Sequence, residues 1–343
     1  MKRHLSCLLL AAALVTAACG SDETSGGADV GDAGAASLTV YSGRSEELVG
    51  PLVEQFEGET GIDVEIRYGD TAQMAGAILE EGDNSPADVF FGQDAGALGA
   101  LSDEGRFRAL DPAVLEKVDP QFRSVDGQWV GVSGRARVAV YNTEMLSEAD
   151  LPASILDFTD DRWAGGKIGW APTNGSFQAF VTALRVLEGE DGARAWLEGI
   201  QANEPRVYDG NVPIVEAAGS GEIQVGFVNH YYLYRFLADD PAFPAANHLF
   251  TEGDVGSLVN VAGVGIIGTG EHQDSAERFV EFLLGEPAQQ YFAAETFEIP
   301  LVDGIEAAPG LPDLESLKQP DINLNGLADL EGTLELLTDV GAI

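Results

Sequence analysis

Two adjacent tyrosines, Tyr231 and Tyr232, are the residues of this chain with the clearest chemical potential. They follow a predicted strand at 223–228 and begin a predicted helix that Asn229 would cap. Open α/β sheets bind their ligands at this edge. A phenol loses its proton near pH ~10, but a bound cation or a helix N-terminus stabilises the anion. Two phenolates would form a hard, anionic oxygen site for a highly charged metal ion, whereas the alternative is ordinary aromatic packing.

A second polar motif, Asn174-Gly175-Ser176, lies between a predicted strand at 167–170 and a predicted helix at 177–187. Backbone N–H groups at such a turn can bind an anion, because they point out of the first helical turn together. An ordinary helix cap is the alternative for this motif taken alone. Its occurrence in the same chain as the tyrosine pair favours the anion site.

The elements that must position these motifs alternate between strand and helix. Residues 37–41 and 62–66 alternate as strands, and a helix between them carries Leu48, Leu52 and Phe56 on one face. The same alternation starts again after Asn142. We therefore expect an α/β protein of two lobes with a cleft between them.

We place the first lobe at 38–138 plus 264–313 and the second lobe at 139–263 plus 314–343. The hinge strands are expected near 137–140 and 261–267.

The N-terminus has the layout of a secretory signal at 1–18, with a basic start and a short apolar run. Small residues precede Cys19, which resembles a bacterial lipoprotein signal in which Cys19 becomes the lipidated N-terminus. Simple secretion is the alternative. Residues 19–37 are rich in Gly, Ser, Ala and Asp and read as a flexible tether. Since Cys7 lies in the leader, neither a disulfide nor a thiolate metal site is expected in the mature protein.

The composition is strongly acidic, with 57 acidic against 18 basic residues and a formal net charge of -39. Such a surface repels phosphate backbones, so nucleic-acid binding is not expected. Contact with a membrane would depend on the lipid anchor. The chain has four histidines and contains no G-x-S-x-G or H-E-x-x-H motif, so we do not expect an enzyme. A pair of glycosidase carboxylates facing across the cleft is the alternative that stays open.

Several motifs together resemble the ferric-iron-binding proteins of bacterial ABC importers. The motifs are Tyr41-Ser42-Gly43-Arg44, Ser85-Pro86-Ala87-Asp88-Val89-Phe90, Ser133-Gly134-Arg135-Ala136-Arg137, Asn174-Gly175-Ser176-Phe177 and Asn229-His230-Tyr231-Tyr232. The resemblance runs from about residue 38 to the C-terminus. It implies a periplasmic-binding-protein fold of the two-crossover type, similar to a transferrin lobe. It also implies an extracytoplasmic monomer that captures Fe(III) and delivers it to an ABC permease.

The resemblance also implies particular site residues. The paired tyrosine ligands of the family fall on Tyr231 and Tyr232. A synergistic anion, phosphate or carbonate, would complete the iron shell. Its binding residues fall on Asn174, Gly175, Ser176, Asn211 and Asn229.

Two positions depart from the family's pattern. The histidine ligand of the family falls on Ser45 and its glutamate ligand on Gln93. The metal could then be held by one lobe, an anion and water, or Glu46, Glu47 or Asp94 could replace the missing ligands. Of these three we favour Glu46, for which a surface helix charge is the alternative. The loss of both ligands leaves open a different cargo, such as thiamine, a polyamine, a phosphonate or another oxyanion.

Other side chains near the motifs have weaker assignments. By the same resemblance, Arg135 or Arg137 would form bidentate hydrogen bonds to the anion or to a phenolate. His230 is expected beside the tyrosines as a supporting or exposed imidazole rather than a ligand. Tyr41 and Tyr141 would join a tyrosine-rich iron shell or, as we favour, pack in the core.

Overall fold

One long strand, β4 (Trp129–Asn142), belongs to two β-sheets in the computed structural model of this chain. The structure describes residues 36–250, 253–312, 314–317 and 319–343. The predicted leader, Cys19 and most of the tether therefore lie outside the described residues. Within the described ranges no helix is both long and apolar enough to cross a membrane.

The first sheet begins with three parallel strands in the order β2-β1-β3 and continues with antiparallel β9 and the first half of β4. Its strands are β1 (Ser37–Ser42), β2 (Asp63–Tyr68), β3 (Val89–Gly92), β9 (Val259–Ile266) and the short β10 (Ile299–Pro300). The helices of this lobe are α1 (Glu46–Thr60), α2 (Thr71–Glu81), α3 (Ala95–Asp103), α4 (Pro112–Leu115), α8 (Gln273–Leu283) and α9 (Glu286–Ala294). Parallel neighbours joined through helices are the β-α-β arrangement that the sequence pattern predicts.

The second sheet is built on the other half of β4, which pairs antiparallel with β7 and with β8. Strand β5 then pairs parallel with both β7 and β6. The strands are β5 (Ile168–Trp170), β6 (Arg206–Val207), β7 (Val225–Asn229) and β8 (Ala245–His248). The helices are α5 (Gly175–Ala202), α6 (Asn211–Gly219), α7 (Tyr231–Asp239) and α10 (Leu330–Asp339). The α/β fold in two lobes is therefore confirmed.

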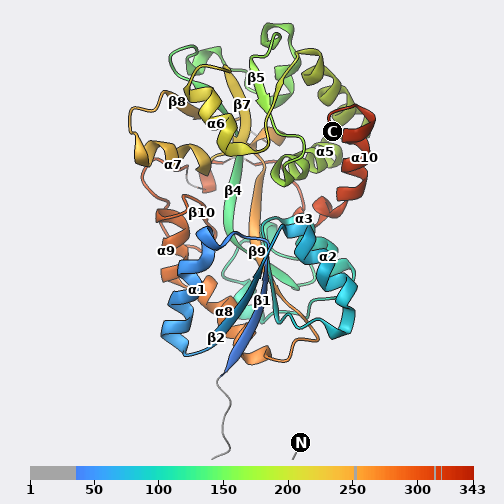
Figure 1. Cartoon of the computed structure of the whole chain (residues 1–343), viewed down its shortest axis with the longest axis vertical. Helices are drawn as coiled ribbons and strands as arrows, with labels where there is room; N and C mark the ends of the chain where they lie inside the picture. Colours follow the sequence, from blue (N-terminus) through green and yellow to red (C-terminus); the bar gives the residue numbers. More distant parts are fainter. Residues whose placement is uncertain (1–35, 251–252, 313, 318) are drawn as a thin grey trace, which may run out of the picture. The chain divides into compact units, whose positions relative to one another are not determined.

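The change from one sheet to the other occurs between Ala136 and Arg137. Residues up to Ala136 pair with β9, and residues from Arg137 onward pair with β7. Strand β9 returns the chain to the first sheet and pairs with β3 and β4 along its length. Figure 1 shows β4 and β9 side by side where they pass from one lobe toward the other.

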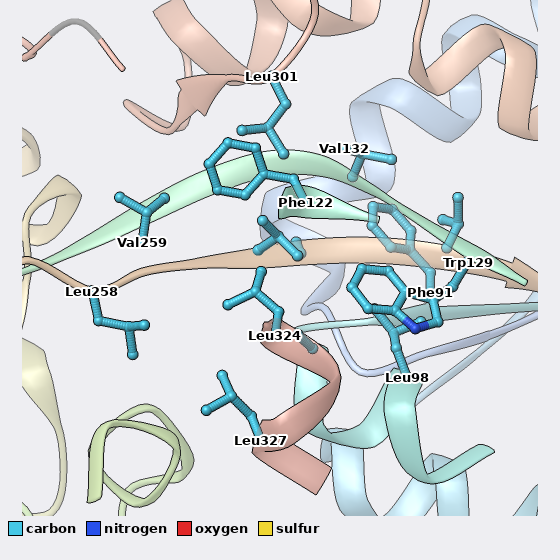
Figure 2. Packing of buried hydrophobic residues seen from close by; sticks show 14 of the residues in the cluster. Phe91, Leu98, Phe122, Trp129, Val132, Leu258, Val259, Leu301, Leu324 and Leu327 are labelled. Carbon is cyan, nitrogen blue, oxygen red and sulfur yellow. The ribbon is translucent and has the colours of Figure 1, made fainter. Parts of the chain in front are cut away.

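The C-terminal segment packs against both lobes. Leu324 and Leu327, in a short 3-10 helix at Leu324–Ala328, are buried with Leu98 and Trp129 of the first lobe (Figure 2). Full burial of a leucine side chain contributes ~1.5–3 kcal/mol, so these contacts hold the segment in place. Helix α10 then packs on α5 of the second lobe, where Thr333 hydrogen-bonds Thr182 at 2.8 Å between the two hydroxyls.

Candidate functional site

A cavity of about 800 Å³ opens where the carboxyl ends of strands from both sheets meet. This is the edge at which open α/β sheets bind ligands. Its lining includes Gly43, Ser45, Asp70, Thr71, Gln93 and Asp94 from the first lobe and Asn174, Gly175, Ser176, Asp209, Asn229 and Tyr232 from the second. Several of the sequence-predicted residues therefore share one cavity.

The two tyrosines at the start of α7 differ in exposure. Tyr232 lines the cavity, whereas Tyr231 is only 1% exposed. Their rings stack with centroids 4.2 Å apart and planes inclined by 29°. The hydroxyl of Tyr231 is buried and makes no hydrogen bond within the described residues. An unpartnered buried hydroxyl is costly, so a ligand that reached this atom would compensate the lost hydrogen bond.

The electrostatic surroundings of Tyr231 oppose ionisation in the empty site. Burial raises the pKa of its phenol, and the neighbouring Tyr232 raises it further, while Arg135 acts in the opposite direction. The residue is therefore a neutral phenol at pH 7. A highly charged cation placed against the oxygen would reverse this balance, because it stabilises the phenolate directly.

Four of the predicted anion-binding residues form one hydrogen-bonded network. Asn174 caps α5, and its Oδ1 accepts from the backbone N–H of Ser176 at 3.1 Å and from its hydroxyl at 2.6 Å. Asn211 donates to the same oxygen at 3.1 Å, and its own Oδ1 accepts the backbone N–H of Asn229 at 3.1 Å. Gly175 is the first residue of α5, and open space lies where its side chain would be. The network thus surrounds a helix N-terminus that faces the cavity.

One sequence prediction about this region is wrong. Asn229 does not cap the helix of the tyrosines but ends strand β7, because Asn211 on α6 takes its backbone N–H. The residue before α7 is His230, whose backbone is helical and whose side chain makes no capping bond. The strand also begins at Val225 rather than two residues earlier.

Arg137 is buried beside the anion network. Its guanidinium lies 5.5 Å from the ring centroids of Phe177 and Phe180, and it donates to the carbonyl of Phe227 at 2.9 Å and to Ser176 Oγ at 3.5 Å. Within the described residues no carboxylate forms an ion pair with it. Burial lowers the pKa of Arg137 to about 9, so the group is still charged at pH 7. A buried cation without a carboxylate partner favours a bound anion.

Arg135 lies on the same strand and also lines the cavity. It donates to the main-chain carbonyl of Gln93, and to that of Val261 at 3.4 Å. The guanidinium therefore ties β4 to the loop after β3 while its charge acts on Tyr231.

The first lobe offers few metal donors to the cavity. Ser45 and Gln93 line it, and Gln93 Oε1 is buried without a hydrogen-bond partner in the described chain. The carboxylate of Asp94 accepts the Ala97 N–H at 3.1 Å and so caps α3. Glu46 is exposed in the first turn of α1 and is absent from the cavity lining. Across the described residues, no group of three His, Cys, Asp or Glu side chains converges as a metal site.

Tyr41 and Tyr141, the tyrosines weighed above for a tyrosine-rich iron shell, are engaged outside the cavity. Tyr41 donates to Glu81 at 3.0 Å and accepts from Arg67 at 3.1 Å. Tyr141 donates to Glu148 at 3.1 Å. Neither tyrosine lines the cavity, which agrees with the packing role favoured for both.

Sequence reasoning did not find the buried ion pair that lies behind the tyrosines. Arg44 and Glu298 are fully enclosed and meet in two parallel contacts, Nη1–Oε1 at 2.7 Å and Nη2–Oε2 at 2.6 Å. Thr296 donates to Glu298 at 2.9 Å. Arg44 stands in a motif quoted above, but its partner is far along the chain and has no local signature.

His230 is buried against this pair. Its Nδ1 accepts the backbone N–H of Ala136 at 3.1 Å, and its ring meets Tyr231 edge to face. Burial lowers its pKa to about 4, with Glu298 acting in the opposite direction, so the imidazole is neutral at pH 7. The imidazole therefore supports the start of α7 from inside the protein, which is the supporting role expected for it rather than the exposed one.

The fold and this cavity define a two-lobed solute-binding protein. The family model described as "Bacterial extracellular solute-binding protein" matches residues 84–323, and the chain belongs to this family.

Its relatives include the Fe(3+)-binding periplasmic protein of Serratia marcescens, 32% identical over 89% of this chain and 90% of the relative. Iron uptake protein A1 of Synechocystis is 33% identical over 84% of this chain and 82% of the relative. Among solved structures, iron-bound HitA from Pseudomonas aeruginosa is 33% identical, covers 89% of this chain and 99% of its own, and has a TM-score of 0.84. Apo ferric ion-binding protein A of Pasteurella haemolytica has a TM-score of 0.80 at 28% identity, over 89% of this chain and 97% of its own.

Proposed function

We propose that this protein captures Fe(III) in the cavity, with Tyr231 and Tyr232 as phenolate ligands. The observation that carries the proposal is a pair of stacked tyrosines, of which Tyr232 lines the cavity and Tyr231 has an unpartnered buried hydroxyl. Most residues of the predicted anion site line the same cavity. Phenolate oxygens are hard ligands and suit a hard trivalent ion. Relatives named for ferric iron support the same cargo and do not favour thiamine, polyamines, phosphonates or oxyanions as alternatives.

A synergistic anion, phosphate or carbonate, occupies the network beside the iron. Asn174, Gly175, Ser176, Asn211 and Asn229 bind it through backbone and side-chain donors. Arg137 supplies positive charge next to Ser176 of this network, and Arg135 supplies positive charge near Tyr231. The anion in turn completes the iron shell with oxygen atoms that the protein does not provide.

The protein is an extracytoplasmic carrier and delivers its cargo to an ABC permease, as extracellular solute-binding proteins do. We further propose that it acts as a monomer held at the membrane by lipid on Cys19, and that it is no enzyme. The two lobes close over the cargo about β4 and β9, the strands that pass between them. Small-angle scattering should show a smaller radius of gyration with iron than without it, and an unchanged radius would argue against closure.

The iron proposal is tested by colour, because phenolate bound to Fe(III) absorbs visible light. Purified protein given ferric citrate and phosphate should develop a visible absorption band. Tyr231→Phe and Tyr232→Phe should each lose or weaken this band. Tyr234→Phe is the matched control, since Tyr234 lies on the same helix but donates to the carbonyl of Gly310 at 2.6 Å instead. A colourless wild-type protein, or variants as coloured as the wild type, would overturn the proposal.

A further inference from the structure

We infer that Asp70 is the carboxylate ligand that the first lobe contributes to Fe(III) when the lobes close. The inference rests on the proposed function and extends it to a residue at the opposite wall of the cavity. Asp70 lies directly before α2, at the carboxyl end of β2, and it lines the same cavity as Tyr232.

The position of Asp70 is fixed by its neighbour Thr71. The hydroxyl of Thr71 donates to the carbonyl of Gly43 at 3.3 Å and accepts the backbone N–H of Gln93 at 3.3 Å. Gly43 packs so closely against this hydroxyl that a side chain there would lie 2.2 Å from it. Thr71 thus ties together the loops that follow β1, β2 and β3. The backbone of Asp70 is therefore held at the shared edge where Ser45 and Gln93 also face the cavity.

Asp70 is also the carboxylate of this wall that is free to bind. It occupies the position before α2, yet its side chain makes no capping hydrogen bond, and among the described residues it forms no ion pair. Asp94 lines the same wall, but its carboxylate is buried and already holds the Ala97 N–H. Because this exposed aspartate does not cap the helix that follows it, its carboxylate oxygens are available for a cation.

The charge of the site accommodates such a group. Two phenolates compensate two of the three positive charges of Fe(III), and the charge of the synergistic anion is shared between the metal and the buried Arg137. Ser45 and Gln93 offer only a neutral hydroxyl and a neutral amide oxygen. A negative oxygen donor is the ligand that a hard trivalent ion prefers, so Asp70 is the better partner on this lobe. A ligand on each lobe also couples metal binding to closure.

Asp209 is the rival carboxylate, because it too lines the cavity. It precedes α6 and lies on the lobe that already carries both tyrosines. A ligand from this position would add charge without joining the two lobes. The two aspartates therefore make different predictions for the iron-induced compaction of the protein.

The test compares iron-loaded wild type with Asp70→Asn, Asp70→Glu and Asp209→Asn, with Glu80→Gln as a matched control on the exposed face of α2. Each protein is loaded with ferric citrate and phosphate, and the free citrate that removes half of the visible band is measured. For Asp70→Asn we expect a band that survives through the tyrosines, a tenfold or greater loss of resistance to citrate, and a smaller iron-induced compaction in small-angle scattering. Asp70→Glu should recover part of the resistance, and Glu80→Gln should match the wild type.

The outcomes separate the two proposals. Wild-type resistance and compaction in Asp70→Asn would overturn the assignment of Asp70 while the coloured band upholds the tyrosines. A loss confined to Asp209→Asn would overturn it as well. A wild-type protein without a visible band would overturn the iron function and the Asp70 ligand together.

Discussion

The rings of Tyr231 and Tyr232 stack at 4.2 Å, but only the ring of Tyr232 reaches the cavity. The hydroxyl of Tyr231 is enclosed without a hydrogen-bond partner in the described chain. This arrangement lowers the stability of the empty protein, because the buried hydroxyl has lost its hydrogen bonds to water without gaining others.

The first prediction follows from that cost. Tyr231→Phe should lose or weaken the iron colour yet raise the stability of the iron-free protein by ~1 kcal/mol, since it removes an unpartnered buried polar group. Urea unfolding monitored by fluorescence measures the change. Tyr232→Phe is the comparison and should leave the stability nearly unchanged. A clear loss of stability in Tyr231→Phe would show that its hydroxyl is satisfied in solution.

The second prediction concerns His230 and pH in the iron-free protein. Burial lowers its pKa in the folded state to about 4, whereas an unfolded histidine titrates near ~6.5. Between these two pH values the histidine is protonated in the unfolded chain but not in the folded protein. The free energy of unfolding therefore falls as the pH falls, by about 3 kcal/mol across this range. Urea unfolding at several pH values should show a shallower slope between pH ~6.5 and ~4.5 for His230→Asn than for the wild type. Parallel slopes would contradict a neutral buried imidazole.

The third prediction concerns the Arg44–Glu298 ion pair. Burial raises the pKa of Glu298, but the paired guanidinium outweighs it and the net pKa is lowered. The pair therefore stabilises the fold above the ordinary carboxyl pKa, and its contribution is lost as the pH falls through the lowered value. Arg44→Met should cost ~3–5 kcal/mol at pH 7, because it leaves a buried charge without a partner. The double variant Arg44→Met with Glu298→Leu should recover most of that loss. If both variants are equally unstable, packing rather than charge explains the pair.

The fourth prediction uses the close contact between β7 and α6. A methyl group at Gly226 would lie 2.2 Å from Cγ2 of Ile214, one turn along α6 from Asn211. Gly226→Ala should therefore cost ~1–3 kcal/mol and displace Asn211 from the anion network. Thermal unfolding and the phosphate dependence of iron loading measure the two effects. Gly58→Ala, on α1 with open space around it, should instead be neutral or stabilising. An unchanged phosphate dependence in Gly226→Ala would show that α6 adapts.

Periodicity and turn chemistry predict the α/β order and the two lobes, because each depends on residues close together in the sequence. The same local signals place Tyr231 and Tyr232 at the start of a helix and Asn174 at the cap of another. Long-range contacts carry no such signal. Nothing in the sequence around Arg44 indicates an ion pair with Glu298. The sequence around Asn229 predicts a helix cap, whereas in the structure its backbone N–H donates to Asn211.

All 14 residues of β4 are buried, so no change in its hydrophobic pattern marks the residue at which the strand passes from one sheet to the other. Asp70 was overlooked for another reason. An aspartate before a helix is usually a cap, and only the structure shows that its side chain makes no such bond.

The change of partner within β4 has an electrostatic consequence. Arg135 hydrogen-bonds to β9 in one sheet, and Arg137 hydrogen-bonds to β7 in the other, on either side of the point where β4 passes between them. A bend at this point therefore changes the spacing of two like charges. If the lobes close as proposed, the distance between the two guanidinium groups would change with the bend of β4. The positive potential that acts on an anion in the cavity would then depend on the position of the lobes.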